Sequence, residues 1–133
     1  MRTIGIVGSR RRDSSEDLEA TRKVFLSIYE KGDTLVSGGC PKGGDRFAEI
    51  FAKEYSVPIT IHYPDKSKLK GNQRWHYAEI NFARNTLIAQ DSDVLIACVA
   101  SDRTGGTEDT IKKAKNLGKK IVLVPNGETE TIF

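Results

Sequence analysis

Short apolar runs alternate along the chain with segments whose apolar residues recur every three or four positions. The runs have the length and the glycine boundaries of buried strands, and the recurring positions have the period of amphipathic helices. Five strands are predicted, over residues 3–8, 34–37, 58–62, 93–99 and 120–124. Four helices are predicted between them, over residues 14–31, 45–55, 76–90 and 107–117.

The first helix is expected to begin with Ser14 or Ser15 as its cap and to end before Gly32, and Asp45 is expected to cap the second. The helical stripes predict which side chains face the core. They are Leu18, Thr21, Phe25 and Ile28 in the first helix, Phe47, Ile50, Phe51 and Tyr55 in the second, and Ile80, Ala83, Leu87 and Ile88 in the third.

The strands are continuously apolar, which is typical of a parallel sheet covered on both faces. The expected fold is therefore α/β, a Rossmann-like three-layer sandwich around a five-stranded, mainly parallel sheet of order 3-2-1-4-5. Residues 1–133 are predicted to form one domain. Residues 125–133 could pair with the sheet, dock elsewhere or extend freely, and residues 63–75 are predicted to form a long loop.

Composition narrows the class of protein. The chain is 38% hydrophobic, which is too apolar for a disordered protein, and its formal net charge of +3 permits an anionic ligand without requiring nucleic acid. No apolar stretch approaches the roughly 20 residues of a membrane span, and no signal-peptide pattern opens the chain. Cys40 and Cys98 form no metal-binding pattern. A cytoplasmic protein with no metal, no cofactor and no membrane contact is expected.

Three loops follow predicted strands one, two and four, and parallel strands bring all three to one edge of the sheet. The first is Gly8-Ser9-Arg10, which offers close backbone approach, a hydroxyl and a guanidinium. The third is Arg103-Thr104-Gly105-Gly106-Thr107, which opens a helix whose free N–H groups suit a phosphate.

The second loop runs from Ser37 through Gly38, Gly39 and Lys42 to Asp45. Its glycines could present several N–H groups as an anion-binding nest, and Lys42 could add a point charge. It lacks the spacing of a Walker A motif.

Several other residues are candidates for chemistry. Cys40 would need a base, and the sequence does not place His62 or His76 near it, whereas Cys98 in a strand is expected to be core. The basic segment from Lys66 to Arg74 could contact nucleic acid, although a solvated loop is the simpler interpretation.

Three segments of the chain resemble known families. They are residues 4–10, the Ser37-Gly38-Gly39 loop with Gly43 and Asp45, and Arg84-Asn85 followed by Gly105-Gly106-Thr107. The first two segments resemble the DprA/Smf DNA-processing proteins. The third, which holds the arginine and the later glycine loop, resembles the LOG proteins. Together they resemble the SLOG superfamily over residues 3–124, with an order most similar to its small, stand-alone YspA-like branch.

The resemblance implies a nucleotide pocket made by the three loops, and pairing of copies into a homo-oligomer. LOG proteins are phosphoribohydrolases that use an arginine, matched by Arg84, and a glutamate three residues after the threonine of the glycine loop. That glutamate is replaced by Thr110, so Glu108 or Asp109 would have to substitute for it.

The leading hypothesis is a binder of a nucleotide or a nucleotide-derived phosphate, acting as a sensor or ligand-binding protein. A phosphoribohydrolase using Arg84 with Glu108 or Asp109 is the second, and a single-stranded nucleic-acid binder is the third. The residues expected to bind the ligand come from the three loops and the third helix. They are Gly8, Ser9, Arg10, Ser37, Gly38, Gly39, Lys42, Asp45, Arg84, Asn85, Thr104, Gly105, Gly106 and Thr107.

Overall fold

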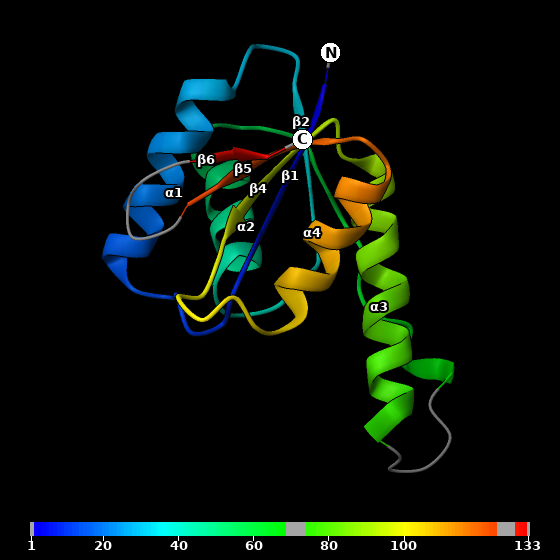
Figure 1. The fold of residues 1–133 in the computed structure, drawn as a ribbon. Helices are drawn as coiled ribbons and strands as arrows, with labels where there is room; N and C mark the ends of the chain where they lie inside the picture. Colours follow the sequence, from blue (N-terminus) through cyan, green and yellow to red (C-terminus); the bar gives the residue numbers. More distant parts are fainter. Residues whose placement is uncertain (1, 69–73, 125–129, 133) are drawn as a thin grey trace.

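The predicted alternation of strands and helices is present in a computed structural model that describes residues 2–68, 74–124 and 130–132 (Figure 1). The strands are β1 (Thr3–Gly8), β2 (Thr34–Ser37), β3 (Ile59–Ile61), β4 (Val94–Cys98), β5 (Lys120–Leu123) and β6 (Glu130–Ile132). The helices are α1 (Ser15–Ile28), α2 (Gly44–Glu54), the short 3-10 helix η1 (Lys66–Lys68), α3 (Arg74–Asp91) and α4 (Gly106–Asn116).

All strands belong to one sheet of order β3-β2-β1-β4-β5-β6. The first five are parallel in the order 3-2-1-4-5, as predicted, and β6 pairs antiparallel with β5. Of the three outcomes left open for the tail, residues 130–132 thus adopt pairing with the sheet. The order reverses at β1, which lies between β2 and β4, so the crevice expected at this switch point opens beside the end of β1.

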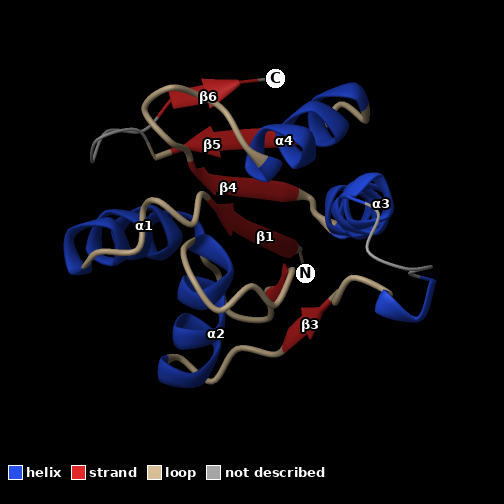
Figure 2. Cartoon of the chain, turned by 90° about the horizontal axis from the view of Figure 1, so that it is seen from below, coloured by secondary structure: helices blue, strands red, loops and turns tan. Residues whose placement is uncertain are grey.

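Two helices cover each face of the sheet (Figure 2). α1 and α2 pack on one face around Phe25, Phe47 and Phe51, none of which is exposed. α3 and α4 pack on the other around Ile88, Leu95 and residues of β5. Within the described ranges, no helix combines the length and the apolar character that a membrane span requires.

Helix ends follow local hydrogen bonds. Ser14 caps α1 in a capping box with Asp17, which confirms one of the two predicted caps. The helix ends at Ile28 rather than near Gly32, because the Asp33 carboxylate accepts the N–H of Glu30 at 2.9 Å.

The predicted cap of α2 is wrong. Gly43, at φ 77°, is the N-cap and makes no side-chain bond, and the helix begins at Gly44. Asp45 therefore lies in the first turn, and its carboxyl group turns back to accept the N–H of Cys40 at 3.1 Å.

The predicted core stripe of α3 is half wrong. Ile80 and Ile88 are buried, but Ala83 and Leu87 are exposed. Arg84 and Asn85 face inward instead, and Asn85 is only 5% exposed. The reason is that this face of α3 lines a polar cavity. α3 also begins at Arg74, so it takes up the end of the predicted loop, whose residues 69–73 lie outside the described part of the chain.

α2 lies in direct backbone contact with the end of β1. A Cβ atom on Gly44 would stand 2.2 Å from the carbonyl carbon of Val7 and 2.3 Å from the backbone nitrogen of Gly8. Backbone atoms cannot rotate away, so this position excludes every side chain.

Gly44→Ala is expected to lower the free energy of unfolding by about 1–3 kcal/mol, the usual cost of forcing atoms into a packed region. Gly106→Ala is the matched control, because a Cβ atom there meets nothing within 4 Å. Chemical denaturation of both variants measures the difference. Equal stability of the two would contradict the close packing of α2 on β1.

Candidate functional site

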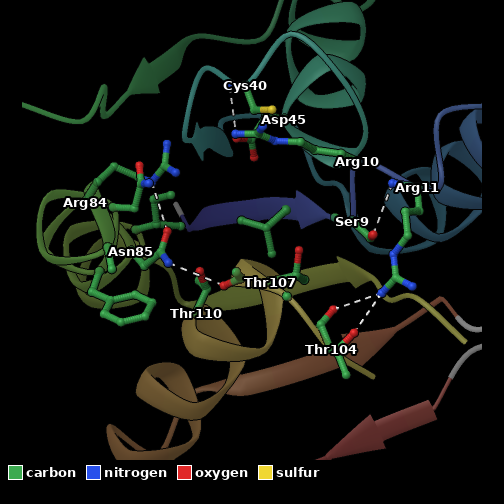
Figure 3. A pocket seen from close by; sticks show the side chains of 18 residues that line it. Ser9, Arg10, Arg11, Cys40, Asp45, Arg84, Asn85, Thr104, Thr107 and Thr110 are labelled. Carbon is green, nitrogen blue, oxygen red and sulfur yellow. Dashed lines mark hydrogen bonds between the residues drawn. The ribbon is translucent and has the colours of Figure 1, made fainter. Parts of the chain in front are cut away.

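A cavity of about 370 Å³ opens at the carboxyl ends of β1, β2 and β4, within the size range of small-molecule sites. Cys40 and Asp45 lie on one side of it and Thr104, Thr107 and Thr110 on the other (Figure 3). Arg84 and Asn85 reach it from α3, Ser9 and Arg11 lie at its far end, and the Arg10 side chain extends from that end toward the side of Cys40 and Asp45 (Figure 3). The described chain thus brings residues from all three predicted loops and from α3 to one cavity.

The loop after β4 presents an open helix end. Gly105, at φ 109°, is the N-cap of α4, and no side chain caps this end. Gly106 has open space where a side chain would lie, and both glycines line the cavity together with Thr107. The first N–H groups and the positive end of the helix dipole of α4 therefore lie at the cavity, an arrangement that favours an anion.

The three arginines after β1 have different roles. Arg11 forms a two-point ion pair with Asp102, at 2.7 and 2.8 Å, and donates to the Thr104 hydroxyl at 2.9 Å. Arg12 bonds Asp17 and the carbonyl groups of Val99 and Val124.

Arg10 differs from its two neighbours. It lines the cavity, is exposed, and makes no hydrogen bond or ion pair with the described residues. Its guanidinium is therefore the one of the three that is free to meet an anion. Arg11 instead joins the loop after β1 to the loop that presents α4.

The loop after β2 uses its donors within the protein. The N–H of Cys40 bonds the Asp45 carboxyl group at 3.1 Å, and the N–H of Gly43 bonds Asp13 at 2.7 Å. The Gly43 N–H and the Arg46 guanidinium lower the pKa of Asp13. Of the residues in this segment that were expected to bind the ligand, only Asp45 lines the cavity. The others, which do not line it, are Ser37, Gly38, Gly39 and Lys42.

Arg84 and Asn85 connect the two sides of the cavity. Arg84 donates to the Gly38 carbonyl oxygen at 2.5 Å and to the Asn85 side-chain oxygen at 2.9 Å. The Asn85 amide in turn donates to Asp109 at 3.1 Å and to the Gly106 carbonyl oxygen at 3.4 Å. Asn85 thus orients Arg84 and holds the first turn of α4 at once.

The two carboxylates considered for catalysis are engaged elsewhere. Glu108 pairs with Arg103 at 2.9 Å, and Asp109 pairs with Lys113 at 2.8 Å as well as with Asn85. Neither lines the cavity, whereas Thr110, which is 1% exposed, does. Among the described lining residues, Asp45 is the one carboxyl group.

The cysteines and histidines bring no further chemistry to the cavity. Cys40 lines it, but His62 pairs with Asp91 at 2.6 Å and is not part of the lining. The His76 side chain lies outside the described part. Cys98 is core, as predicted, and burial raises the pKa of its thiol. No group of three metal-ligating side chains gathers among the described residues.

Sequence reasoning missed the part that α3 contributes to the lining. Ala78, Asn81, Phe82 and Ile88 line the cavity along with Arg84 and Asn85. Asn81, Asn85 and Ile88 follow the i, i+4, i+7 spacing of one helix face, so the signal was present. It was obscured because this inward face is polar.

Asn85→Ala is expected to lower the free energy of unfolding by about 1–3 kcal/mol, because Arg84 and the first turn of α4 both lose a buried partner. Thr86→Ala on the same helix is the control, since the Thr86 hydroxyl bonds only the Phe82 carbonyl oxygen within its own helix. Urea denaturation of both variants compares them. A loss no greater for Asn85→Ala than for the control would show that Asn85 does not link the two sides.

Solved structures with the same fold include two proteins that are named for the molybdenum cofactor. One is the molybdenum cofactor binding protein from the phototrophic bacterium Rippkaea orientalis, with a TM-score of 0.69 and 23% identity over 93% of this chain and 76% of that one. The other is the molybdenum cofactor carrier protein of Chlamydomonas reinhardtii, with a TM-score of 0.64 and 21% identity over 92% of this chain and 75% of that one.

At these identities the two structures support the fold alone. No curated protein matches the chain. The model of the SLOG cluster4 family, however, matches residues 1–133. This confirms the resemblance to the SLOG superfamily seen in the glycine loops. The chain belongs to the SLOG cluster4 family.

Proposed function

We propose that this protein binds a small molecule that joins a phosphate to a nucleotide-like heterocycle, and that it holds this ligand without cleaving it. The observation that carries the proposal is the meeting of an uncapped helix end and an unpaired arginine in one cavity. The α4 end offers N–H groups from Gly106 and Thr107, and Arg10 offers a planar guanidinium. Both features suit a phosphate.

The remaining lining suits the rest of such a ligand. Phe82, which is 45% exposed and has the Lys113 ammonium 5.1 Å from its ring centre, adds an aromatic side chain, and Asn81 offers an amide that can both donate and accept hydrogen bonds. Ala78 and Ile88 add apolar surface. A planar, nitrogen-containing ring system matches this mixture better than a bare anion does.

The two solved structures add support at the level of fold. They are named for the molybdenum cofactor, which, like a nucleotide, combines a nitrogen heterocycle with a phosphate ester. A carrier or sensor role needs a binding cavity and no reaction machinery. The phosphoribohydrolase alternative is less favoured, because Glu108 and Asp109 are paired away from the cavity. Cytoplasmic location, homo-oligomerisation and the YspA-like branch stay predictions from the sequence.

Ligand identity is tested by mass spectrometry of small molecules released from the denatured protein, together with thermal melts against nucleotides and pterin phosphates. A ligand at one hundred times its Kd should stabilise the fold by about 2.7 kcal/mol. Nucleoside 5′-monophosphates incubated with the protein should stay intact. Release of free base that Arg84→Ala abolishes would establish the hydrolase instead, and no response to any compound would contradict the proposal.

Gly106→Asp tests the position of the phosphate. The new carboxylate would lie at the open end of α4 and repel an anion, so binding should fall at least tenfold while the protein stays folded. Gly106→Asn is the matched control, because it has the same shape without the charge. Calorimetric titration with the ligand found above compares the two. Equal affinity of both variants would place the phosphate elsewhere.

A further inference from the structure

The Asp45 carboxyl group, the Ser37 hydroxyl group and the Ile6 carbonyl group form a row of three oxygen atoms. Two hydrogen bonds along this row need two hydrogens, and the serine supplies one. The Ser37 hydroxyl oxygen lies 2.5 Å from the Ile6 carbonyl oxygen and 2.9 Å from one oxygen of the Asp45 carboxyl group. Both contacts are hydrogen-bond distances, and two full hydrogen bonds need two hydrogens. A hydroxyl group carries one hydrogen, and a carbonyl oxygen carries none.

The serine hydrogen belongs to the shorter contact. The Ile6 carbonyl group can only accept, so the hydroxyl of Ser37 must donate to it. The contact between Ser37 and Asp45 then has a hydrogen only if the carboxyl group supplies it. If Asp45 were ionised, the single Ser37 hydrogen would have to serve two acceptors, the Ile6 carbonyl oxygen and the carboxylate, so at least one of these two short, buried contacts would be a weakened bond.

We propose that Asp45 is a neutral carboxylic acid that donates its proton to Ser37, and that loss of this proton weakens the binding of anions in the cavity. The second part rests on the function proposed above, whereas the first does not. Both residues are buried, with Ser37 unexposed and Asp45 7% exposed. The other Asp45 oxygen accepts the Cys40 N–H at 3.1 Å, as a neutral acid also can.

The charged groups around Asp45 act in opposite directions. Burial raises its pKa, and this outweighs the lowering by the backbone N–H of Cys40 and by the nearby Arg84. Arg84 reaches close from α3, since a Cβ atom on Gly38 would lie 2.6 Å from its guanidinium and 2.8 Å from the Asp45 carboxyl group. Arg46, on the same helix as Asp45, is paired with Asp13 at 2.8 Å.

A neutral Asp45 has a direct consequence for ligand choice. Arg10 and Arg11 line the cavity from the loop after β1, and Asp45 is the one carboxyl group among the described lining residues. While Asp45 keeps its proton, the cavity presents cations and helix N–H groups without a facing carboxylate. Ionisation would add a negative charge in a poorly hydrated place, where charges interact strongly. Affinity for an anion should therefore fall as the pH rises through the pKa of Asp45.

The protonation state is tested by carbon NMR of the full chain labelled at the aspartate carboxyl carbon, with Asp45→Asn assigning the signal. The signal of Asp45 should titrate above the ordinary range of aspartate. Ser37→Ala separates the two hydrogen-bond directions. If Ser37 accepts from a neutral acid, its loss lowers the midpoint, whereas if Ser37 donates to a carboxylate, its loss raises it. An ordinary midpoint, or an upward shift in Ser37→Ala, overturns the first part.

Stability gives an independent measurement if Ser37→Ala fails to fold. A raised folded-state pKa makes the protein most stable below the unfolded pKa, and stability is lost as the pH rises through the folded pKa. The chain should therefore lose stability relative to Asp45→Asn over that pH interval. Asp45→Asn keeps a donor to Ser37 and an acceptor for Cys40, so its stability should lack this step. The same dependence of stability on pH in the unmodified protein and in Asp45→Asn would overturn the proposal that Asp45 is a neutral acid.

The effect of Asp45 ionisation on anion binding is tested with sulfate, whose charge is constant over the pH range of the titration. Both proteins carry Cys40→Ser, which removes the thiol from the cavity lining, and Asp13 and Asp102 stay ionised because their pKa values are lowered. Stabilisation by sulfate should fall as the pH rises through the Asp45 midpoint, and it should not fall in Asp45→Asn. Equal pH dependence would overturn the second part. Absence of any sulfate binding would count against the anion site itself and leave the NMR result standing.

Discussion

The architecture of the site depends on the backbone contact between the first turn of α2 and the end of β1. Gly44 has no room for a side chain against Val7 and Gly8, so the helix begins directly on the central strand. This contact places Asp45 beneath the loop after β2, where its carboxyl group meets Ser37 and the Cys40 N–H. The cavity opens beside the same contact, at the switch point of the sheet.

The two glycine-rich loops, after β2 and after β4, differ in whether their N–H groups are available to a ligand. In the loop after β2, the N–H groups of Cys40 and Gly43 already bond the carboxyl groups of Asp45 and Asp13. The loop after β4 leaves the end of α4 without a cap and open to the cavity. Asn85 couples the two through Arg84 on one side and Gly106 on the other. A ligand phosphate would complete the helix end that opens into the cavity without a side-chain cap.

Much of the fold was predictable, because continuous apolar strands and helical periods alternate with clear boundaries. The strand order was predictable as well, since right-handed crossovers leave few alternatives. The inward face of α3 was not, because Arg84 and Asn85 break the rule that apolar residues face inward. The direction of the Asp45 side chain was also hidden, because an aspartate after a glycine turn is equally typical of a helix cap. Both wrong predictions concern residues at the cavity, where sequences often depart from the local rules for secondary structure and burial because the residues form a site.

The central claim is that the open end of α4, rather than the glycine-rich loop after β2, receives the phosphate. Titration of nitrogen-labelled protein with adenosine 5′-monophosphate, followed by amide NMR, tests it directly. The account predicts that the largest shifts occur at the N–H groups of Gly106 and Thr107, while those of Cys40 and Gly43, which already bond carboxylates, move little. Largest shifts at Cys40 and Gly43 would contradict it.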